Sequence, residues 1–468
     1  MTDFTSSTAL ARIERDPLGT VEVPADRLYG AQTQRAIENF PISGRPVGAL
    51  DPLVVALAEV KKACAITNVN AGEIAPSTGQ AIVKACDEII GGRWRSEFPI
   101  DVLQGGAGTS TNMNMNEVVA NRALQILGMA PGCYGSVHPN DHVNRNQSTN
   151  DAYASAVRIS CIRLNQSLLN EVAELASAFS EKAESFAGIP KLGRTQLQDA
   201  VTIELGDEFR AFADTLTEDV DRGREIASLF LEINLGGTAI GSGLGSTPAY
   251  RDAIIAELCA VTGLRLVRAR NLYEASWDMG TFVLYSGFLK RLAAKLSKIC
   301  NDLRLLASGP RGGMGEIRLP GRQAGSSLMP GKVNPVIPEA VNQVAYRVFG
   351  LDTAITFAAE AGQLQLNAFE PLIVASLHEA VTLLVSAMRV LRENCVAGIE
   401  ADSIRCQATV SNSLAQATEL VQQLGYQVAS EIVKLAHRDG LTLQQARRMW
   451  AEASHAELDI ASEHGIRR

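Results

Sequence analysis

The stretch from Asp151 to Phe186 contains neither proline nor glycine, and this feature constrains the fold more than any other. Its apolar residues recur at steps of three and four, the spacing of one helix face: Leu164, Leu168, Val172, Leu175 and Phe179. A helix of about 35 residues is roughly 50 Å long, which is more than a compact domain needs. Rods of this length usually pack side by side, so the sequence predicts a helical bundle.

Four further segments predict long helices, at 199–233, 274–307, 336–360 and 369–393. Hydrophobic residues make up 46% of the chain and aromatic residues only 5%, a balance that favours closely packed helices over sheets. We therefore expect an all-α fold. The 274–307 segment also carries small residues away from its main apolar stripe, so we expect neighbours on more than one face and assembly of several chains through these helices.

Composition divides the chain into three predicted domains. Residues 1–140 alternate short helical stretches with Gly, Pro and Asn, and VEVPADRLYG (21–30) gives one brief strand signal. Residues 141–395 contain the long helices. Residues 396–468 are more polar and charged, which predicts a small C-terminal helical domain.

Charge and cysteine usage exclude several classes of function. The formal net charge is −8, whereas a nucleic-acid surface requires clustered Lys and Arg, so we expect no nucleic-acid partner. The eight cysteines lie far apart without a CxxC pair, and we expect reduced thiols in the core. No run of about 18 apolar residues occurs and the first residues lack the pattern of a secretion signal, so we expect a cytoplasmic protein without a membrane partner.

The segment GSSLMPGKVNP at 325–335 combines two serines, a lysine and an asparagine in one loop. Glycines and prolines are frequent between Ser308 and Pro335, whereas the flanking segments predict helices. A mobile loop between rigid supports is typical of an active-site lid. The alternative is a surface linker, but linkers seldom place two hydroxyl groups and a lysine at such close spacing.

Three other segments offer neutral hydrogen-bond donors suited to carboxylate oxygens: Thr109, Ser110, Thr111 and Asn112 in the first, Ser148, Thr149 and Asn150 in the second, Thr195 and Gln196 in the third. Each adjoins a predicted helix, and a single cluster of this kind is most often a helix N-cap. Four such segments in one chain, one of them with Lys332, favour a site for a small anion.

Other motifs do not indicate a second chemistry. GSGLGS at 241–246 follows a predicted helix, which argues against a dinucleotide-binding loop. His138 and His142 surround Pro139 and cannot form the paired ligands of a helical metal site. The six histidines offer no evident partner for a nucleophilic serine. We therefore expect neither NAD nor a catalytic metal.

A serine with a neighbouring lysine and asparagine suits removal of a carbon-bound proton beside a carboxylate. That step produces an enediolate with two negative charges, which Lys332 and Asn334 would stabilise. Ser326 or Ser327 would act as the base, and an alkoxide in this role requires stabilisation by surrounding dipoles.

At these residues the chain resembles the aspartase/fumarase superfamily, whose GSSxMPxKxN signature matches residues 325–334. The resemblance extends over roughly residues 12–395 and includes GTSTNMNMNEV, HPNDHVNRNQSTNDA and GRTQLQDAV. Within the superfamily, two features resemble the aspartate ammonia-lyase branch and not the class II fumarases. Gln196 stands where fumarases have a histidine, and EAGQLQLNAFEP at 360–371 is similar to aspartases.

The resemblance implies a three-domain α-helical fold and a homotetramer with a core of twenty helices, in which three subunits build each active site. It also implies the role of each site residue. Ser326 would remove the C3 proton of L-aspartate, Lys332, Asn334 and Thr195 would bind its α-carboxylate, and Thr109, Ser148, Thr149 and Ser327 would bind its β-carboxylate. Asn150 would face the amino group with Thr109 and Gln196, and Ser110 adds a neutral donor beside Thr109.

The resemblance further implies catalysis without an organic cofactor and, in some members, activation by a divalent metal at a separate site that this sequence does not locate. Three alternatives stay open. One is a class II fumarate hydratase. Another is a lyase that releases a different amine from a succinate skeleton, because the sequence departs from the family pattern after about residue 405. The third is a catalytically silent relative, of the kind recruited as lens proteins.

Overall fold

The structure is a computed structural model that describes residues 11–463. Within that range the chain divides into two compact units. The first unit contains the residues up to 170 together with 219–294 and 344–385. The second contains 171–218, 295–343 and the residues from 386 onward. The three-domain division at 140/141 and 395/396 stays a prediction.

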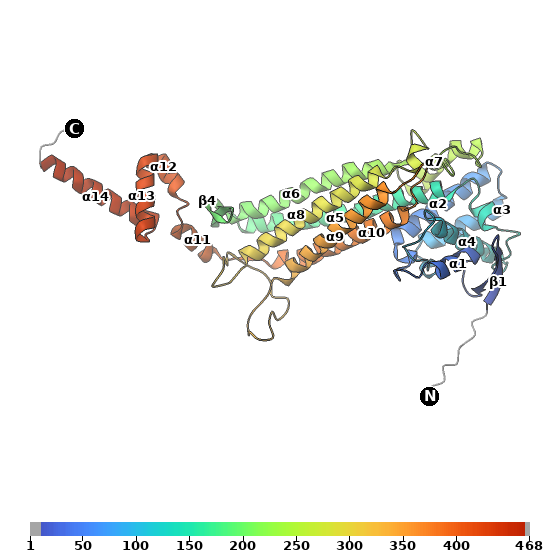
Figure 1. Cartoon of the computed structure of the whole chain (residues 1–468), viewed down its shortest axis with the longest axis horizontal. Helices are drawn as coiled ribbons and strands as arrows, with labels where there is room; N and C mark the ends of the chain where they lie inside the picture. Colours follow the sequence, from blue (N-terminus) through green and yellow to red (C-terminus); the bar gives the residue numbers. More distant parts are fainter. Residues whose placement is uncertain (1–10, 464–468) are drawn as a thin grey trace, which may run out of the picture. The chain divides into compact units, whose positions relative to one another are not determined.

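Long helices dominate the fold, as predicted (Figure 1). Each of the following contributes residues to both units: α5 (Thr149–Ser185), α6 (Leu205–Ala227), α8 (Gly280–Leu306), α9 (Val336–Glu360) and α10 (Glu370–Asn394). Helices α5, α9 and α10 begin and end within two residues of their predicted bounds. The expectation of an all-α fold built around long helices is therefore confirmed.

Two of the predicted helices were too long. Residues 199–204 belong to strand β4 (Gln198–Glu204), which pairs with β3 (Pro190–Thr195), because the β-branched run from Val201 to Ile203 suits a pleated strand. Helix α8 begins at Gly280 and not at 274, since Glu274–Ser276 form a separate 3-10 turn, and the Asp278 carboxylate accepts the N–H of Gly280, the first residue of α8, at 3.2 Å.

The first unit contains a hairpin and a group of shorter helices beside its portions of the long ones. Strand β2 confirms the strand signal at 21–30, whereas its partner β1 was not predicted. Helix α2 is buried along almost its whole length and contacts both α3 and α7. The elements are β1 (Ala11–Asp16), β2 (Gly19–Pro24), α1 (Ala31–Asn39), α2 (Asp51–Asn70), α3 (Pro76–Ile90), α4 (Thr109–Ile126), α7 (Pro248–Thr262), and the short strands β5 (Glu232–Ile233) and β6 (Val267–Arg268).

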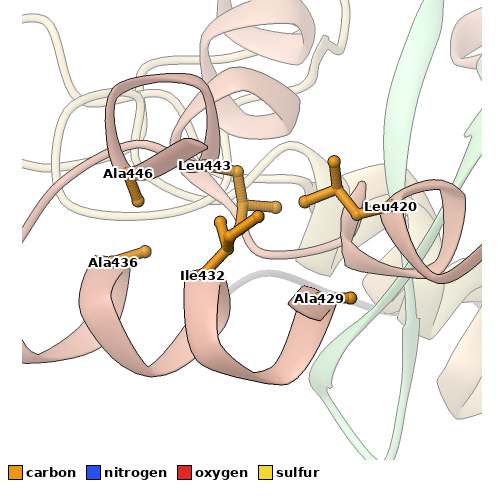
Figure 2. Close-up of a cluster of buried hydrophobic side chains, with 6 residues drawn as sticks. All are labelled: Leu420, Ala429, Ile432, Ala436, Leu443 and Ala446. Carbon is orange, nitrogen blue, oxygen red and sulfur yellow. The ribbon is translucent and has the colours of Figure 1, made fainter. Parts of the chain in front are cut away.

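The second unit contains two further hairpin-like pairs and the C-terminal helices. The pairs are β3 with β4 and β7 (Ile317–Arg318) with β8 (Glu400–Ala401). The C-terminal helices have a small apolar core of their own, made by residues such as Leu420, Ile432 and Leu443 (Figure 2). These helices are α11 (Ser403–Asn412), α12 (Ala417–Leu424), α13 (Tyr426–Asp439) and α14 (Leu443–Glu463).

Among the described residues, the segment Glu370–Gly398, which contains α10, is the one long and apolar enough to cross a membrane, through its most apolar window of 18 residues. Two thirds of that window is buried inside the fold, as expected for the core helix of a bundle. The eight cysteines are free, and six are buried. The expectation that all of them lie in the core is wrong for Cys133, which is exposed, and for Cys259, which is half-buried.

Candidate active site

The loop at 325–334 is closed on itself by hydrogen bonds between its two ends. The Gly325 N–H donates to the Lys332 carbonyl at 2.9 Å, and the Asn334 amide donates to the Gly325 carbonyl at 2.7 Å. A side chain at position 325 would place its Cβ 2.4 Å from the Lys332 carbonyl oxygen, so this close approach requires glycine. The predicted lid is therefore a defined ring, not an open linker.

The two serines of the loop have different surroundings. Ser326 Oγ accepts backbone N–H groups from Leu328 at 3.1 Å and from Met329 at 2.9 Å. Ser327 is exposed, and its hydroxyl makes no hydrogen bond with the described residues. Backbone donors aimed at an oxygen stabilise its anionic form. This geometry favours Ser326 over Ser327 as an alkoxide.

The rest of the loop presents groups without partners inside the chain. Lys332 is exposed and forms no ion pair with any described residue. Leu328 is 85% exposed, and Met329 and Val333 are more than half exposed. Apolar side chains on such a tip suit a loop that contacts another surface when the site is assembled or closed.

Helix α4 begins at Thr109 and carries the first donor segment at its N-terminus. Thr109 is exposed and Ser110 half-buried, and neither hydroxyl makes a hydrogen bond with the described residues. Gly108 precedes the helix with φ +83°, and a Cβ there would lie 2.4 Å from the Tyr153 ring of α5. Glycine at 108 thus allows the start of α4 to lie against α5.

Helix α5 begins at Thr149, directly after Ser148. Ser148 Oγ accepts the Asn150 N–H at 3.3 Å, and the Asp151 carboxylate accepts the Ser148 N–H at 2.9 Å. These two reciprocal hydrogen bonds form a helix N-cap. Ser148 therefore has the capping role that Ser/Thr/Asn clusters before a helix most often have. Capping leaves the O–H of Ser148 available as a donor to a ligand.

Thr149 and Asn150 are oriented by neighbouring segments of the first unit. The Asn112 amide donates to Thr149 Oγ1 at 3.2 Å, and the Asn150 amide donates to the Ala239 carbonyl at 2.7 Å. Since Thr149 accepts from Asn112, its own O–H remains to be donated. Since the Asn150 amide nitrogen is engaged, its Oδ1 remains as an acceptor for a donor such as an ammonium group.

Thr195 and Gln196 lie at the exposed tip of the β3–β4 hairpin in the second unit. The hairpin turns through two residues, Gln196 with φ +53° and Leu197 with φ +63°. Two central residues with positive φ are characteristic of the tight turns that fit the twist of a hairpin. Within the described residues no hydrogen bond joins this tip to the 325–334 loop.

The predicted site residues fall into two groups. The structure brings Thr109 and Ser110 together with the Ser148–Asn150 segment in the first unit, through the contacts of Asn112 and Tyr153. The hairpin tip and the serine loop belong to the second unit.

The sequence interpretation missed a polar network beneath Ser148 and Thr149. Lys61 of α2 is fully buried and donates to Asn144 Oδ1 at 2.9 Å and to Gln147 Oε1 at 2.8 Å. The amides of Asn112 and Asn116 also donate to Asn144 Oδ1, each at 3.2 Å. A signal was available, because a lysine inside the apolar run LVVALAEVKKACAI is forced toward the interior.

A metal centre has no donor set in the part of the chain that the structure describes. Within it no group of three or more His, Cys, Asp or Glu side chains is arranged to hold a metal ion. His142 accepts the His138 backbone N–H at 2.8 Å, and His138 accepts the Asn140 N–H at 3.1 Å, so each ring is engaged with the backbone of its own loop. Neither histidine ring is therefore arranged with other described side chains as a metal ligand.

Comparisons with known proteins agree with this arrangement of motifs. A family model described as lyase matches residues 19–350. The aspartate ammonia-lyase of Pseudomonas aeruginosa is 52% identical over 457 residues, which are 97% of this chain and 96% of that protein.

Two solved structures have the same fold. A fumarate lyase:delta crystallin from Brucella melitensis, bound to cobalt, is 52% identical with a TM-score of 0.93, over 94% of this chain and 96% of that one. A class II fumarase from Schistosoma mansoni is 33% identical with a TM-score of 0.88, over 93% of this chain and 95% of that one. The chain therefore belongs to the aspartase/fumarase superfamily of lyases.

Proposed function

We propose that this protein is an aspartate ammonia-lyase, a carbon–nitrogen lyase that converts L-aspartate reversibly to fumarate and ammonia. One observation carries the assignment. The chain is 52% identical to an aspartate ammonia-lyase over nearly its full length, and only 33% identical to a class II fumarase of the same fold. Gln196, where fumarases have a histidine, supports the same choice.

The reaction begins with proton transfer from C3 of L-aspartate to the Ser326 alkoxide. The two backbone N–H groups on Ser326 Oγ support this role, because they stabilise the oxygen while it is charged. The electron pair of the broken C–H bond moves into the β-carboxylate and forms an enediolate. Collapse of the enediolate forms the C2–C3 double bond and expels ammonia from C2, which leaves fumarate.

The remaining site residues bind the two carboxylates and the amino group. Lys332, Asn334 and Thr195 bind the α-carboxylate, where the exposed Lys332 ammonium supplies the positive charge. The β-carboxylate and its enediolate are bound by hydroxyl groups, those of Thr109, Ser148, Thr149 and Ser327. The substrate ammonium donates to Asn150 Oδ1, the atom that the Ala239 contact leaves available, with Thr109 and Gln196 nearby.

The active enzyme is a homotetramer in which different subunits complete each active site. Five long helices per chain would give the twenty of a tetrameric core. Large apolar side chains on these helices support burial between subunits: Leu284 is 57% exposed, Tyr346 57% and Phe357 69%. Three of the β-carboxylate donors, Thr109, Ser148 and Thr149, belong to the first unit, while the serine loop with Ser326, Ser327 and Lys332 belongs to the second.

The chemistry above uses side chains and backbone groups and requires no organic cofactor. A divalent metal, if it activates this enzyme as in some family members, acts outside these steps. We place the protein in the cytoplasm, which is supported by its eight free cysteines, since thiols stay reduced in that compartment.

A substrate screen tests the assignment. Fumarate formation, followed by its ultraviolet absorbance, is expected with L-aspartate and not with L-malate. Fumarate from L-malate alone would identify a fumarate hydratase. Turnover of N-substituted aspartates in preference to L-aspartate would identify a lyase for another amine, and no turnover of any of them would identify a silent relative.

A further inference from the structure

Lys61 is a buried cation whose direct hydrogen-bond partners carry no charge. Its side chain is fully buried, and it forms no ion pair with any described residue. Its two hydrogen-bond partners, Asn144 and Gln147, are neutral amides. A buried charge without a counter-ion is costly and is usually removed or paired. A buried lysine at this position therefore suggests that its charge interacts with a neighbouring group or ligand.

None of the described groups that face Lys61 from its own and the neighbouring helices forms an ion pair with it. Cys64 and Cys86 are buried thiols, and burial raises the pKa of Cys64 to about 12, so both are neutral. Asp151 is also buried, and its charge raises the pKa of Lys61, but its carboxylate accepts the backbone N–H groups of Ser148, Gly236 and Thr238 at 2.9 to 3.0 Å and forms no ion pair with Lys61. Burial lowers the pKa of Lys61 to about 8, which leaves the ammonium charged at neutral pH.

The hydrogen-bond network connects Lys61 to the start of α5. Asn144 Oδ1 accepts hydrogen bonds from both the Lys61 ammonium and the Asn112 amide. The same Asn112 amide also donates to Thr149 Oγ1. The second partner, Gln147, immediately precedes Ser148. Thus both amides bound by Lys61 belong to the support of the Ser148–Asn150 segment.

We propose that Lys61 is a positioning residue whose buried charge serves as the countercharge for the enediolate, acting through Asn144 and Gln147 on the hydroxyls of Thr149 and Ser148. This inference rests on the proposed ammonia-lyase chemistry. Because the β-carboxylate gains a negative charge only as the enediolate forms, a fixed cation beneath its binding segment stabilises the intermediate more than the substrate.

A purely structural lysine would behave differently. It would hold the 144–149 segment in place, so its loss would weaken every ligand equally and lower the stability of the fold. A countercharge instead discriminates between ligands by the negative charge on their oxygens at the β-position. The contrast between a substrate-like and an enediolate-like ligand therefore separates the two roles.

The test uses Lys61→Gln, which removes the charge and keeps a donor, with Lys62→Gln as matched control. Lys62 is the adjacent lysine and is half-buried in an ion pair with Asp87 at 2.7 Å. The ligands are succinate, for the ground state, and the nitronate of 3-nitropropanoate, a planar group in which both oxygens carry formal negative charge, as they do in the enediolate. We expect Lys61→Gln to lower kcat by about 100-fold, and nitronate affinity by a similar factor, with little change for succinate.

Asn144→Asp keeps the proposal testable if Lys61→Gln does not fold. The new carboxylate would pair with Lys61 inside the fold, so folding is retained while the countercharge is neutralised. We expect the same selective loss of kcat and nitronate affinity. Equal losses for succinate and nitronate in either variant, or an unchanged kcat, would overturn the proposal. Wild-type turnover of L-aspartate is measured first, so a failure of the proposed function is recognised separately.

Discussion

Hydrogen bonds within the chain orient single residues of the candidate site. Each bond engages one donor or acceptor group of the side chain and leaves another available for a ligand. Ser326 accepts two backbone N–H groups, and Thr149 accepts the Asn112 amide. Asn150 donates its amide to the Ala239 carbonyl. What remains is a stabilised oxygen at Ser326, a donor O–H at Thr149 and an acceptor at Asn150. These are the three kinds of group that proton removal, carboxylate binding and ammonium binding require.

The first prediction at this scale separates the two serines. Ser326→Ala is expected to lower kcat for L-aspartate by about a thousand-fold or more, because the base is removed. Ser327→Ala is expected mainly to raise KM, because only a carboxylate donor is lost. Both variants should form the same oligomer as the wild type by light scattering. A Ser326→Ala enzyme with near-wild-type kcat, or an inactive Ser327→Ala enzyme, would reassign the base.

The sequence predicts the candidate site residues by type and segment, but not their individual orientation. The 325–334 segment combines two serines, a lysine and an asparagine, and this combination indicates a reactive site from the sequence alone. The choice between Ser326 and Ser327 depends on two backbone N–H groups whose directions are fixed by the folded loop. Likewise, burial of Lys61 could be inferred from its apolar run, whereas its amide partners lie 83 and 86 positions away in the sequence.

At the scale of elements, long helices were predictable and the hairpin that bears Thr195 was not. Helices α5, α9 and α10 have uninterrupted apolar periodicity and clear ends. The β3–β4 hairpin turns at Gln196 and Leu197, both with positive φ, where Asn-Gly would be the usual signal. Without that signal, the run QDAVTIE was assigned to the following helix.

A buried charge cluster anchors this hairpin within the second unit. Glu316 is fully buried and forms ion pairs with Lys191 at 3.1 Å and Arg194 at 2.8 Å, both on β3. Its carbonyl accepts the Asp402 N–H at 2.9 Å, next to β8. Glu316 immediately precedes β7, and the chain then continues toward the serine loop. One carboxylate thus joins the base of the hairpin to the strand that leads to Ser326.

We predict that Glu316→Gln destabilises the fold by about 3 kcal/mol, because it leaves Arg194 without its partner and Lys191 with only Glu208. The KM for L-aspartate should rise as well, since Thr195 and Gln196 lose their fixed position. Urea unfolding and steady-state kinetics measure the two effects. Glu208→Gln is the control, because Glu208 is partly exposed, and it should cost less than about 1 kcal/mol. Equal effects of the two substitutions would contradict the anchoring role.

At the scale of the whole molecule, the candidate site is divided within the sequence. The hydroxyls of Thr109 and Thr149 belong to one compact unit, and Ser326 and Lys332 belong to the other. The serine loop carries Leu328 exposed at its tip, and the long helices carry exposed apolar side chains. No property of one chain's sequence specifies which subunit completes which site, because that depends on the symmetry of the assembly.

Mixing two defective variants tests whether subunits share active sites. Ser326→Ala removes the proposed base from the second unit, and Thr149→Val removes a proposed carboxylate donor from the first. If one subunit supplied both residues, every site in a mixed tetramer would stay defective. If different subunits supply them, random mixing leaves about one quarter of the sites with both residues intact.

We therefore expect co-refolded or co-expressed variants to contain about one quarter of sites with wild-type kcat and KM, which neither variant alone contains. Mixing two preparations of the same variant is the control and should recover nothing. A dilution series that dissociates the mixed tetramer should abolish the recovered activity in parallel with the loss of the oligomer. Because a defective site gains activity only by receiving the missing side chain from another chain, recovery would establish sharing, and its absence in a confirmed mixed tetramer would place the complete site within one subunit.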